Sequence, residues 1–129
     1  ETLGAEMLQW GRDTFGLTIN EFYGQTECNM IVSSSSRLKA TSAGHMGRAV
    51  PGHDVRIIDE TGTEMAPGEV GMIAVHRPDP VMFLQYWRND AATQAKFMGD
   101  WMLTGDLGAA KRCFGGRSFG FCSHPARRA

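Results

Sequence analysis

Two short glycine-bearing segments carry side chains that could bind a nucleotide. The first, YGQTE from Tyr23 to Glu27, places an aromatic ring, an amide, a hydroxyl and a carboxylate close together. Gly24 permits a sharp turn that brings backbone amides near a ligand. The Thr26 hydroxyl can donate to a phosphate oxygen, and the Glu27 carboxylate can hold a magnesium ion. The segment therefore offers groups that suit a nucleoside triphosphate.

The second segment is TGD, which ends in Asp106. Gly105 again allows a tight turn, and the two carboxylate oxygens of Asp106 could accept hydrogen bonds from both hydroxyls of a ribose. Taken alone, each segment is a weak signal, because a lone TGD is more often an ordinary turn with a solvated aspartate.

The first segment is expected to follow a strand. Apolar residues recur at helical spacing from Thr2 to Phe15, and Gly16 stands where a C-terminal helix glycine is favoured. Leu17 to Tyr23 alternates as a strand does, so the order of helix and strand indicates an αβ unit. The YGQTE segment would then be a loop at the carboxyl end of the strand, where α/β sheets commonly bind ligands.

The middle of the chain predicts antiparallel β structure. Residues 33–47 are rich in serine, threonine and glycine and are expected to form an exposed loop. Two strands are predicted beyond this loop, at Val55–Asp59 and Val70–His76, with turns at residues 60–62 and 67–68 between them.

A short helix and one more strand complete the expected order. Asn89 or Asp90 could cap a helix through Phe97, and WMLTGD predicts a short strand that runs into the second glycine loop. The predicted fold class is α/β followed by antiparallel β. Residues 1–50 would be the end of an αβ subdomain that carries the first glycine loop, and residues 51–108 would be part of a small β-barrel subdomain.

The composition excludes several classes of protein. The chain has 129 residues, a formal net charge of −1 and 42% hydrophobic residues, which suits one soluble domain and gives no charge imbalance that favours nucleic acid. No apolar run approaches the roughly 18 residues of a membrane span, and no signal peptide is evident, so a cytoplasmic protein is expected. Cys28, Cys113 and Cys122 are too scattered for a disulfide framework or a paired zinc site and are expected to be free thiols.

Four motifs together resemble the adenylate-forming superfamily of acyl-CoA synthetases, adenylation domains and luciferases. In chain order they are YGQTE, GHMGRAVPGHDVRIIDETG, GEVGMIAVHRPDPVMFLQYW and WMLTGD. The lead-in TINEFYGQTE is most similar to the acetyl and medium-chain acyl-CoA synthetase branch. The resemblance covers roughly Glu1 to Leu107 and implies part of the acyl-adenylating fold.

The resemblance implies an AMP-forming acid–thiol ligase of fatty acid metabolism. In that reaction a small-molecule carboxylate attacks the α-phosphate of ATP, pyrophosphate leaves, and the thiol of coenzyme A then attacks the acyl adenylate. Mg²⁺ offsets the charge of the phosphates. Such catalysis works by positioning and electrostatics and needs no protein nucleophile.

The resemblance also implies roles for individual residues. Tyr23 would lie against the adenine of ATP or AMP, and Asp106 would bind the ribose hydroxyls. Thr26 would contact phosphate and Glu27 would coordinate Mg²⁺, so these two are the candidate catalytic residues. The two residues between Tyr23 and Thr26 would shape the adenine and acyl pocket, namely Gly24 and Gln25.

Parts of the family pattern are missing. The sequence has no Ser/Thr/Gly-rich phosphate loop that ends in lysine, no later hinge and no C-terminal lysine of the kind that acts in adenylation. Residues 109–129 depart from the pattern and carry five basic and no acidic residues from Lys111 onward. We interpret them as a non-family basic tail, which either a shifted reading frame or divergence would explain. A weak nucleic-acid contact through this tail stays open as an alternative.

Two hypotheses follow. The first is a fragment of the large N-terminal domain of an AMP-forming acyl-CoA synthetase, inactive alone. The alternative is a stand-alone nucleotide- or protein-binding module derived from this fold. An exposed sheet edge and an uncovered apolar face are expected to cause self-association. Tyr86 and Trp87 are expected to pack in the core rather than bind a ligand.

Overall fold

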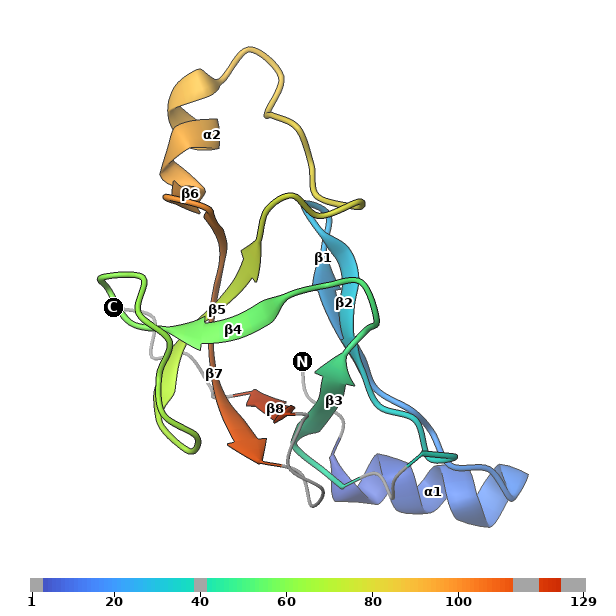
Figure 1. Ribbon diagram of the computed structural model, residues 1–129. Helices are drawn as coiled ribbons and strands as arrows, with labels where there is room; N and C mark the ends of the chain where they lie inside the picture. The colour runs from blue at the N-terminus through green and yellow to red at the C-terminus, as the bar shows by residue number, and fades with distance from the viewer. Residues whose placement is uncertain (1–3, 39–41, 113–118, 124–129) are drawn as a thin grey trace.

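The dominant feature of the computed structural model is one antiparallel sheet, and the structure describes residues 4–38, 42–112 and 119–123 (Figure 1). Along the sheet the strands lie in the order β1-β2-β3-β8-β7-β5-β4, and β6 pairs with β7 beside this path. The elements in chain order are α1 (Ala5–Phe15), β1 (Phe22–Gln25), β2 (Asn29–Ser33), β3 (His45–Ala49), β4 (Val55–Ile58), β5 (Val70–His76), α2 (Asp90–Ala95), β6 (Phe97–Met98), β7 (Trp101–Arg112) and β8 (Phe119–Ser123).

Helix α1 confirms the helical periodicity near the start of the chain. Gly16 ends the helix in the left-handed conformation, with φ of 65°, and its N–H donates to the carbonyl oxygen of Arg12 at 2.9 Å. The strand expected at Leu17–Tyr23 is wrong in its first part, because β1 begins only at Phe22. A strand needs a hydrogen-bonded neighbour, and residues 17–20 pair with no strand in the described part of the chain.

The YGQTE segment lies in a β-hairpin rather than in a loop of an αβ unit. β1 and β2 pair antiparallel, and residues 26–28 form the turn between them. The pairing is irregular between Tyr23 and Gly24, where the two strands approach very closely. A Cβ atom at Gly24 would lie 1.6 Å from the carbonyl oxygen of Asn29, so only glycine fits there.

The TGD segment lies inside the long strand β7, which corrects the expectation of a loop. The register of β7 against β5 shifts between Met72 and Ala74, so residues 104–106 bulge out of the regular ladder. Gly105 has φ of 87°, a left-handed conformation that favours glycine at this bulge. The sequence indicated a tight turn at Gly105, and this glycine instead lies in a bulge of a strand.

Most of the other predicted elements are confirmed. β5 has the predicted bounds, and β4 ends one residue earlier than expected. The Asn89 side chain caps α2 by accepting from the N–H of Ala92 at 3.1 Å, but the helix ends at Ala95, because Phe97 pairs in β6 instead. β3 begins at His45, within the segment expected to be a loop.

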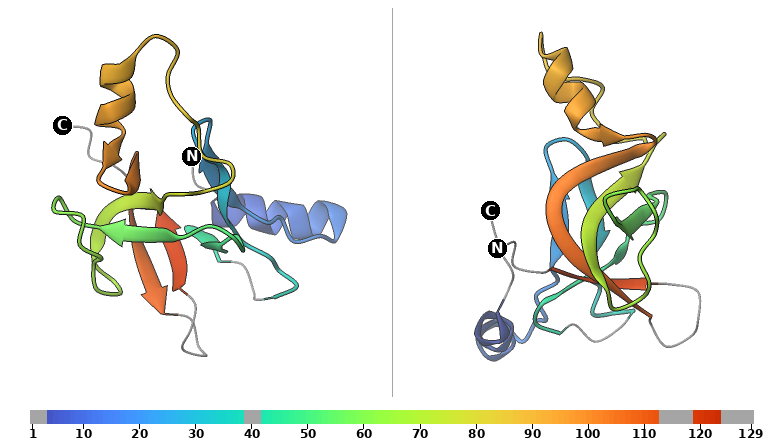
Figure 2. Two further views of the ribbon diagram at one scale, coloured as in Figure 1. Left: turned by 45° about the horizontal axis from the view of Figure 1, so that its top comes forward. Right: turned by 90° about the vertical axis from the view of Figure 1, so that its left-hand side faces the viewer.

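The sheet curves around a single hydrophobic cluster (Figure 2). Figure 2 shows β5 and β7 strongly bent. β1 and β4 stand at the two ends of the strand order, and residues 64 and 65 pair with part of β4. The cluster takes buried residues from the β1–β2 turn and from six strands, namely Cys28, Ile31, Val32, Met46, Val55, Ile57, Ile73, Val75, Met102 and Phe121. Because side chains from β2 and β4 meet in one core, the sheet forms an open, barrel-like half-shell.

The boundaries expected from the sequence, at residues 50 and 108, can be compared with the strands of this sheet. Residue 50 directly follows β3, whereas residue 108 lies inside β7. β7 continues to Arg112 and pairs with β8, so the described residues beyond 108 belong to the same sheet. The rest of the expected basic tail, residues 113–118 and 124–129, lies outside the described residues, and with it Cys113. Neither helix of the described chain has the length and apolar character that a membrane span requires.

Candidate functional site

Asp106 receives hydrogen bonds from two residues of the YGQTE segment. The phenol of Tyr23 donates to Asp106 Oδ2 at 2.7 Å, and Nε2 of Gln25 donates to the same oxygen at 3.2 Å. Gln25 Nε2 also lies 2.8 Å from the carbonyl oxygen of Thr104. The hairpin β1–β2 and the bulge of β7 therefore meet, and they unite the two glycine segments in one site.

Hydrogen bonds of Thr104 hold the bulge of β7 that carries Asp106. The buried Thr104 hydroxyl donates to the carbonyl oxygen of Ile73 on β5 at 2.8 Å and accepts from the N–H of Asp106 at 3.2 Å. Burial raises the pKa of Tyr23, so its phenol stays protonated and acts as a donor at neutral pH. Because these bonds use Oδ2, the other carboxylate oxygen of Asp106 can accept from a ligand hydroxyl.

Glu27 lies in the hairpin turn and is held by the segment that follows β5. The phenol of Tyr86 donates to Glu27 Oε1, and the N–H of Phe83 donates to the Glu27 carbonyl oxygen at 2.7 Å. The hydrogen bond from Tyr86 is the main cause that lowers the pKa of Glu27, and the nearby positive charge of Lys96 acts in the same direction. Glu27 is therefore ionised at neutral pH, while its neighbour Thr26 is exposed.

Sequence reasoning missed Tyr86 and Lys96 as site residues. Tyr86 was expected only to pack, and it lies 59 positions from Glu27 in the chain, so no local spacing reveals the contact. Lys96, at the C-terminal end of α2, brings its Nζ to 3.4 Å from Gln25 Oε1 and 3.3 Å from the carbonyl oxygen of Thr104. The expected packing of Trp87 is wrong, since its side chain is 81% exposed.

The residues at the hairpin turn fit a magnesium ion that arrives with a phosphate ligand. Glu27 and Thr26 offer oxygen donors, which Mg²⁺ prefers. Among the described residues no three His, Cys, Asp or Glu side chains gather into a complete metal cage. Mg²⁺ usually keeps several waters and binds through one or two carboxylates together with substrate phosphates, so a single carboxylate at an open turn suits it.

Three further titratable groups lie in or near the turn. Cys28 is fully buried as a free thiol, and burial raises its pKa. His53 Nδ1 and Asp79 Oδ2 lie 2.6 Å apart with both side chains buried, and they join the β3–β4 connection to the segment that follows β5. No spacing in the sequence pointed to this contact.

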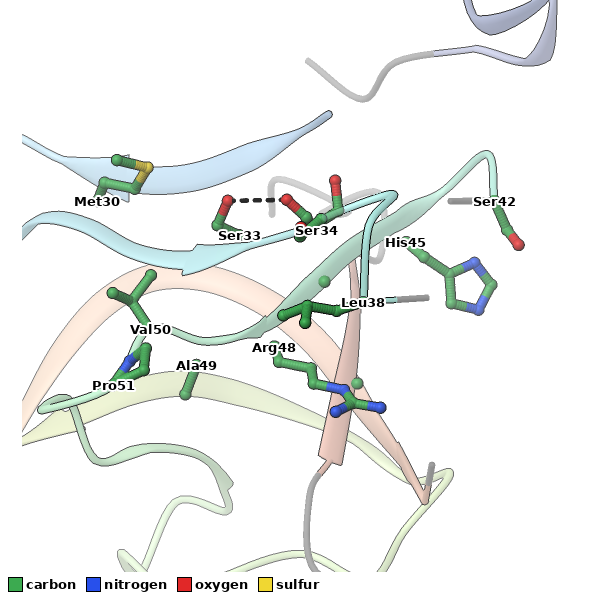
Figure 3. A pocket seen from close by; sticks show the side chains of 13 residues that line it. Met30, Ser33, Ser34, Leu38, Ser42, His45, Arg48, Ala49, Val50 and Pro51 are labelled. Atoms are coloured by element: carbon green, nitrogen blue, oxygen red, sulfur yellow. Dashed lines mark hydrogen bonds between the residues drawn. The ribbon is translucent and has the colours of Figure 1, made fainter. Parts of the chain in front are cut away.

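A separate hollow of about 590 Å³ lies between the hairpin and the β3 region (Figure 3). Figure 3 shows Met30, Val50 and Pro51 at one end of it and His45 and Ser42 at the other. Neither residues 23–28 nor residues 104–106 line this hollow. The cluster around Asp106 and the contacts of Glu27 therefore form a site distinct from the hollow.

The sequence matches known enzymes over most of its length. Residues 1–87 match the family described as AMP-binding enzyme. The chain is 39% identical over 108 residues to the uncharacterized acyl-CoA ligase YtcI of Bacillus subtilis, covering 82% of this chain and 20% of that protein. It is 40% identical over 112 residues to the mitochondrial acyl-coenzyme A synthetase ACSM2 of Rattus norvegicus, covering 84% of this chain and 19% of that protein. The chain thus spans about a fifth of the length of these relatives.

Solved structures share the fold. Apo MatB from Rhodopseudomonas palustris superposes with a TM-score of 0.79 at 34% identity, over 92% of this chain and 22% of that chain. The O-succinylbenzoate coenzyme A synthetase MenE from Bacillus subtilis, solved in complex with ATP and a magnesium ion, superposes with a TM-score of 0.76 at 26% identity, over 94% of this chain and 24% of that chain. The open curved sheet with its preceding helix is therefore a sheet region of the acyl-adenylating fold, in agreement with the predicted fold class.

Proposed function

The chain belongs to the family of AMP-binding enzymes, and on this premise we propose that it forms one wall of the adenylate site of an AMP-forming acyl-CoA synthetase. The whole reaction would join a carboxylate to coenzyme A at the expense of ATP, in a cytoplasmic setting and in fatty acid metabolism. Residues 1–50 and 51–108 would derive from two neighbouring subdomains of such an enzyme. Alone, the 129-residue chain would not complete this reaction.

The observation that carries the proposal is the meeting of Tyr23, Gln25 and Asp106. Three side chains from two distant segments share hydrogen bonds at 2.7 Å and 3.2 Å. A carboxylate held in this way is a preorganised acceptor, which is what recognition of two ribose hydroxyls requires. The ring of Tyr23 would then lie beside the adenine, and Gly24 and Gln25 would shape the pocket around it.

The phosphates of the nucleotide and their Mg²⁺ would bind at the hairpin turn. We assign Glu27 as the ligand of Mg²⁺ and the exposed Thr26 hydroxyl as a donor to phosphate. A bound Mg²⁺ would offset the negative charge of the phosphates. The ionised state of Glu27, which the hydrogen bond from Tyr86 favours, suits this role. The ammonium group of Lys96 lies 3.4 Å from Gln25 Oε1, and its positive charge also favours the ionised form of Glu27.

Calorimetry with AMP and Mg²⁺ tests the site. The wild-type chain should bind AMP weakly, and Asp106→Ala should abolish the heat of binding. Asp100→Ala is the matched control, because Asp100 is an exposed carboxylate that contacts Arg77 at 3.1 Å, and none of the hydrogen bonds described for Asp106 involves it. Absence of binding by the wild-type chain at millimolar AMP would count against the site, as would equal loss in both variants.

Pyrophosphate release tests whether the chain is active alone, and the assembly and folding of the chain separate the two functional hypotheses. The fragment hypothesis expects no release from ATP with carboxylates from acetate to octanoate, since one wall of the site cannot hold the triphosphate. The alternative is a stand-alone binding module, which the self-contained core of the curved sheet favours. AMP binding without pyrophosphate release, together with a monomeric and cooperatively folded chain, would support the module. Clear turnover would overturn the claim that the chain is inactive alone.

A further inference from the structure

One segment clamps Glu27 through both its main chain and its side chain. We call residues 79–86, between β5 and α2, the strap. The N–H of Phe83 donates to the Glu27 carbonyl oxygen at 2.7 Å, and the phenol of Tyr86 donates to Glu27 Oε1. Glu27 is thus fixed at a hairpin turn, where a glutamate side chain would otherwise move among many rotamers.

Tyr86 is held in place by contacts other than its hydrogen bond to Glu27. Its N–H donates to the Thr93 hydroxyl of α2 at 3.0 Å. Its ring lies 4.9 Å from the ring of Phe83, which stacks on Phe97 at 5.8 Å. Since the backbone and the ring are both fixed, the phenol loses little further freedom when it donates to Glu27.

The strap is also anchored at its first residue. Asp79 Oδ2 lies 2.6 Å from His53 Nδ1, and both side chains are buried. Asp79 Oδ1 accepts from the N–H of Val81 at 3.0 Å, which fixes the turn that leads toward Phe83. The strap therefore contacts the β3–β4 region, α2 and the hairpin turn. These contacts hold the phenol of Tyr86 in place beside Glu27.

We propose that Tyr86 is a positioning residue, which holds the Glu27 carboxylate through Oε1 so that its second oxygen, Oε2, would remain available to the magnesium ion of a bound nucleotide. This inference rests on the proposed function, because it takes Glu27 as the metal ligand. A carboxylate has two oxygens, and the bond from Tyr86 uses only Oε1. Outer hydrogen-bond partners that orient a ligand commonly change metal affinity by about tenfold or more when they are removed.

A simple structural cross-link would behave differently. If Tyr86 only joined the strap to the hairpin, its loss would lower the stability of the chain without altering metal affinity relative to AMP affinity. A positioning role predicts that loss of the Tyr86 hydroxyl lowers metal affinity but not AMP affinity. AMP without metal would rely on Tyr23 and Asp106, whereas a metal ion with AMP would rely on the aimed carboxylate of Glu27.

The test uses Tyr86→Phe, which removes the hydroxyl and keeps the ring beside Phe83. Trp87→Phe is the matched control, since that neighbouring side chain is exposed. Mn²⁺ serves as the metal probe, and its binding with AMP is followed by electron paramagnetic resonance. AMP affinity without metal is measured separately by calorimetry. Scalar couplings in NMR spectra of labelled chains report the rotamers of Glu27 without any ligand.

The expected results separate the two claims. Tyr86→Phe should weaken Mn²⁺ binding about tenfold, leave AMP affinity unchanged and turn one Glu27 rotamer into an average of several, while Trp87→Phe changes none of these. Unchanged Glu27 rotamers in Tyr86→Phe, or averaged rotamers already in the wild-type chain, would overturn the positioning role whether or not metal binds. Absence of Mn²⁺ binding by the wild-type chain with AMP, combined with a single Glu27 rotamer, would instead overturn the metal role proposed for Glu27.

Discussion

The phenol of Tyr23 donates a 2.7 Å hydrogen bond to the carboxylate of Asp106, and this bond joins the β1–β2 hairpin to the bulge of β7. The two residues are 83 positions apart in the chain. Burial keeps the phenol protonated, and Gln25 donates to the same carboxylate oxygen at 3.2 Å. The contact therefore both stabilises the approach of the two strands and orients an acceptor in the proposed nucleotide site.

A double-mutant cycle should show that Tyr23 and Asp106 are coupled. Tyr23→Phe and Asp106→Asn should each lower the free energy of unfolding, because hydrogen bonds to charged groups contribute about 1.5–3 kcal/mol when they are well made. The double variant should lose less than the sum of the two, with a coupling of about 1 kcal/mol. Urea denaturation of the four proteins measures this quantity. Additive losses would contradict the coupling.

Alkaline pH should weaken the same contact. The folded state raises the pKa of Tyr23 above its ordinary value of about 10, so the stability that its protonated form contributes is fully present below pH 10. This stability is lost as the pH rises toward the higher pKa of the folded state. We expect the melting temperature of the wild-type chain to fall above about pH 10 more steeply than that of Tyr23→Phe. Parallel declines in the two proteins would argue against the buried phenol.

The sequence predicted which residues lie together in the candidate site better than it predicted the elements that hold them. The helix before Gly16, the strand Val70–His76 and the cap at Asn89 follow from local patterns, and each is present. The strand at Leu17–Tyr23 and the loop at TGD were wrong, since both depend on which neighbouring strand pairs with them. Alternation of side chains does not reveal a bulge, because a bulge is set by the register of its partner strand.

The site shows the same limit. YGQTE and TGD were joined by resemblance, and the contacts of Tyr23 and Gln25 with Asp106 place them together. The contacts of Tyr86 with Glu27 and of Lys96 with Gln25 could not be foreseen, because each spans more than fifty positions in the chain. Tyr86 was expected to pack, because a tyrosine beside a strand is usually a packing residue, and no local pattern singled out Lys96.

Gly24→Ala should disrupt the hairpin. A Cβ atom there would lie 1.6 Å from the carbonyl oxygen of Asn29, a backbone atom that cannot move without breaking the pairing of β1 and β2. We expect a loss of more than about 3 kcal/mol in the free energy of unfolding, or failure to fold. Gly4→Ala is the matched control, since its Cβ would meet open space. A similar stability for the two variants would show that the close approach of the strands is incorrect.

Cys28 should react slowly with thiol reagents. Its side chain is completely buried, and burial raises its pKa, so little thiolate is present at pH 8. We expect iodoacetamide to modify Cys122, which is only partly buried, well before Cys28. Peptide mass spectrometry at successive times measures both rates. Addition of urea should equalise them, and equal rates in the native chain would contradict the burial of Cys28.

The isolated chain should self-associate through the end of the sheet that carries α1. Figure 1 shows α1 at the lower end of the β1–β2 hairpin, and β1 is an edge strand of the sheet. Leu17 and Phe22 are each 66% exposed there, and β1 presents an edge strand that can pair with another chain.

The variants Leu17→Lys and Phe22→Lys should each increase the fraction of monomer, because a charge opposes both apolar contact and edge pairing. Leu84→Lys is the matched control, since Leu84 is 92% exposed and belongs to the strap rather than to α1 or the edge strand β1. Sedimentation velocity over a range of concentrations measures the monomer fraction. A wild-type chain that stays monomeric at every concentration, or a Leu84→Lys variant as effective as the other two, would contradict association through this edge.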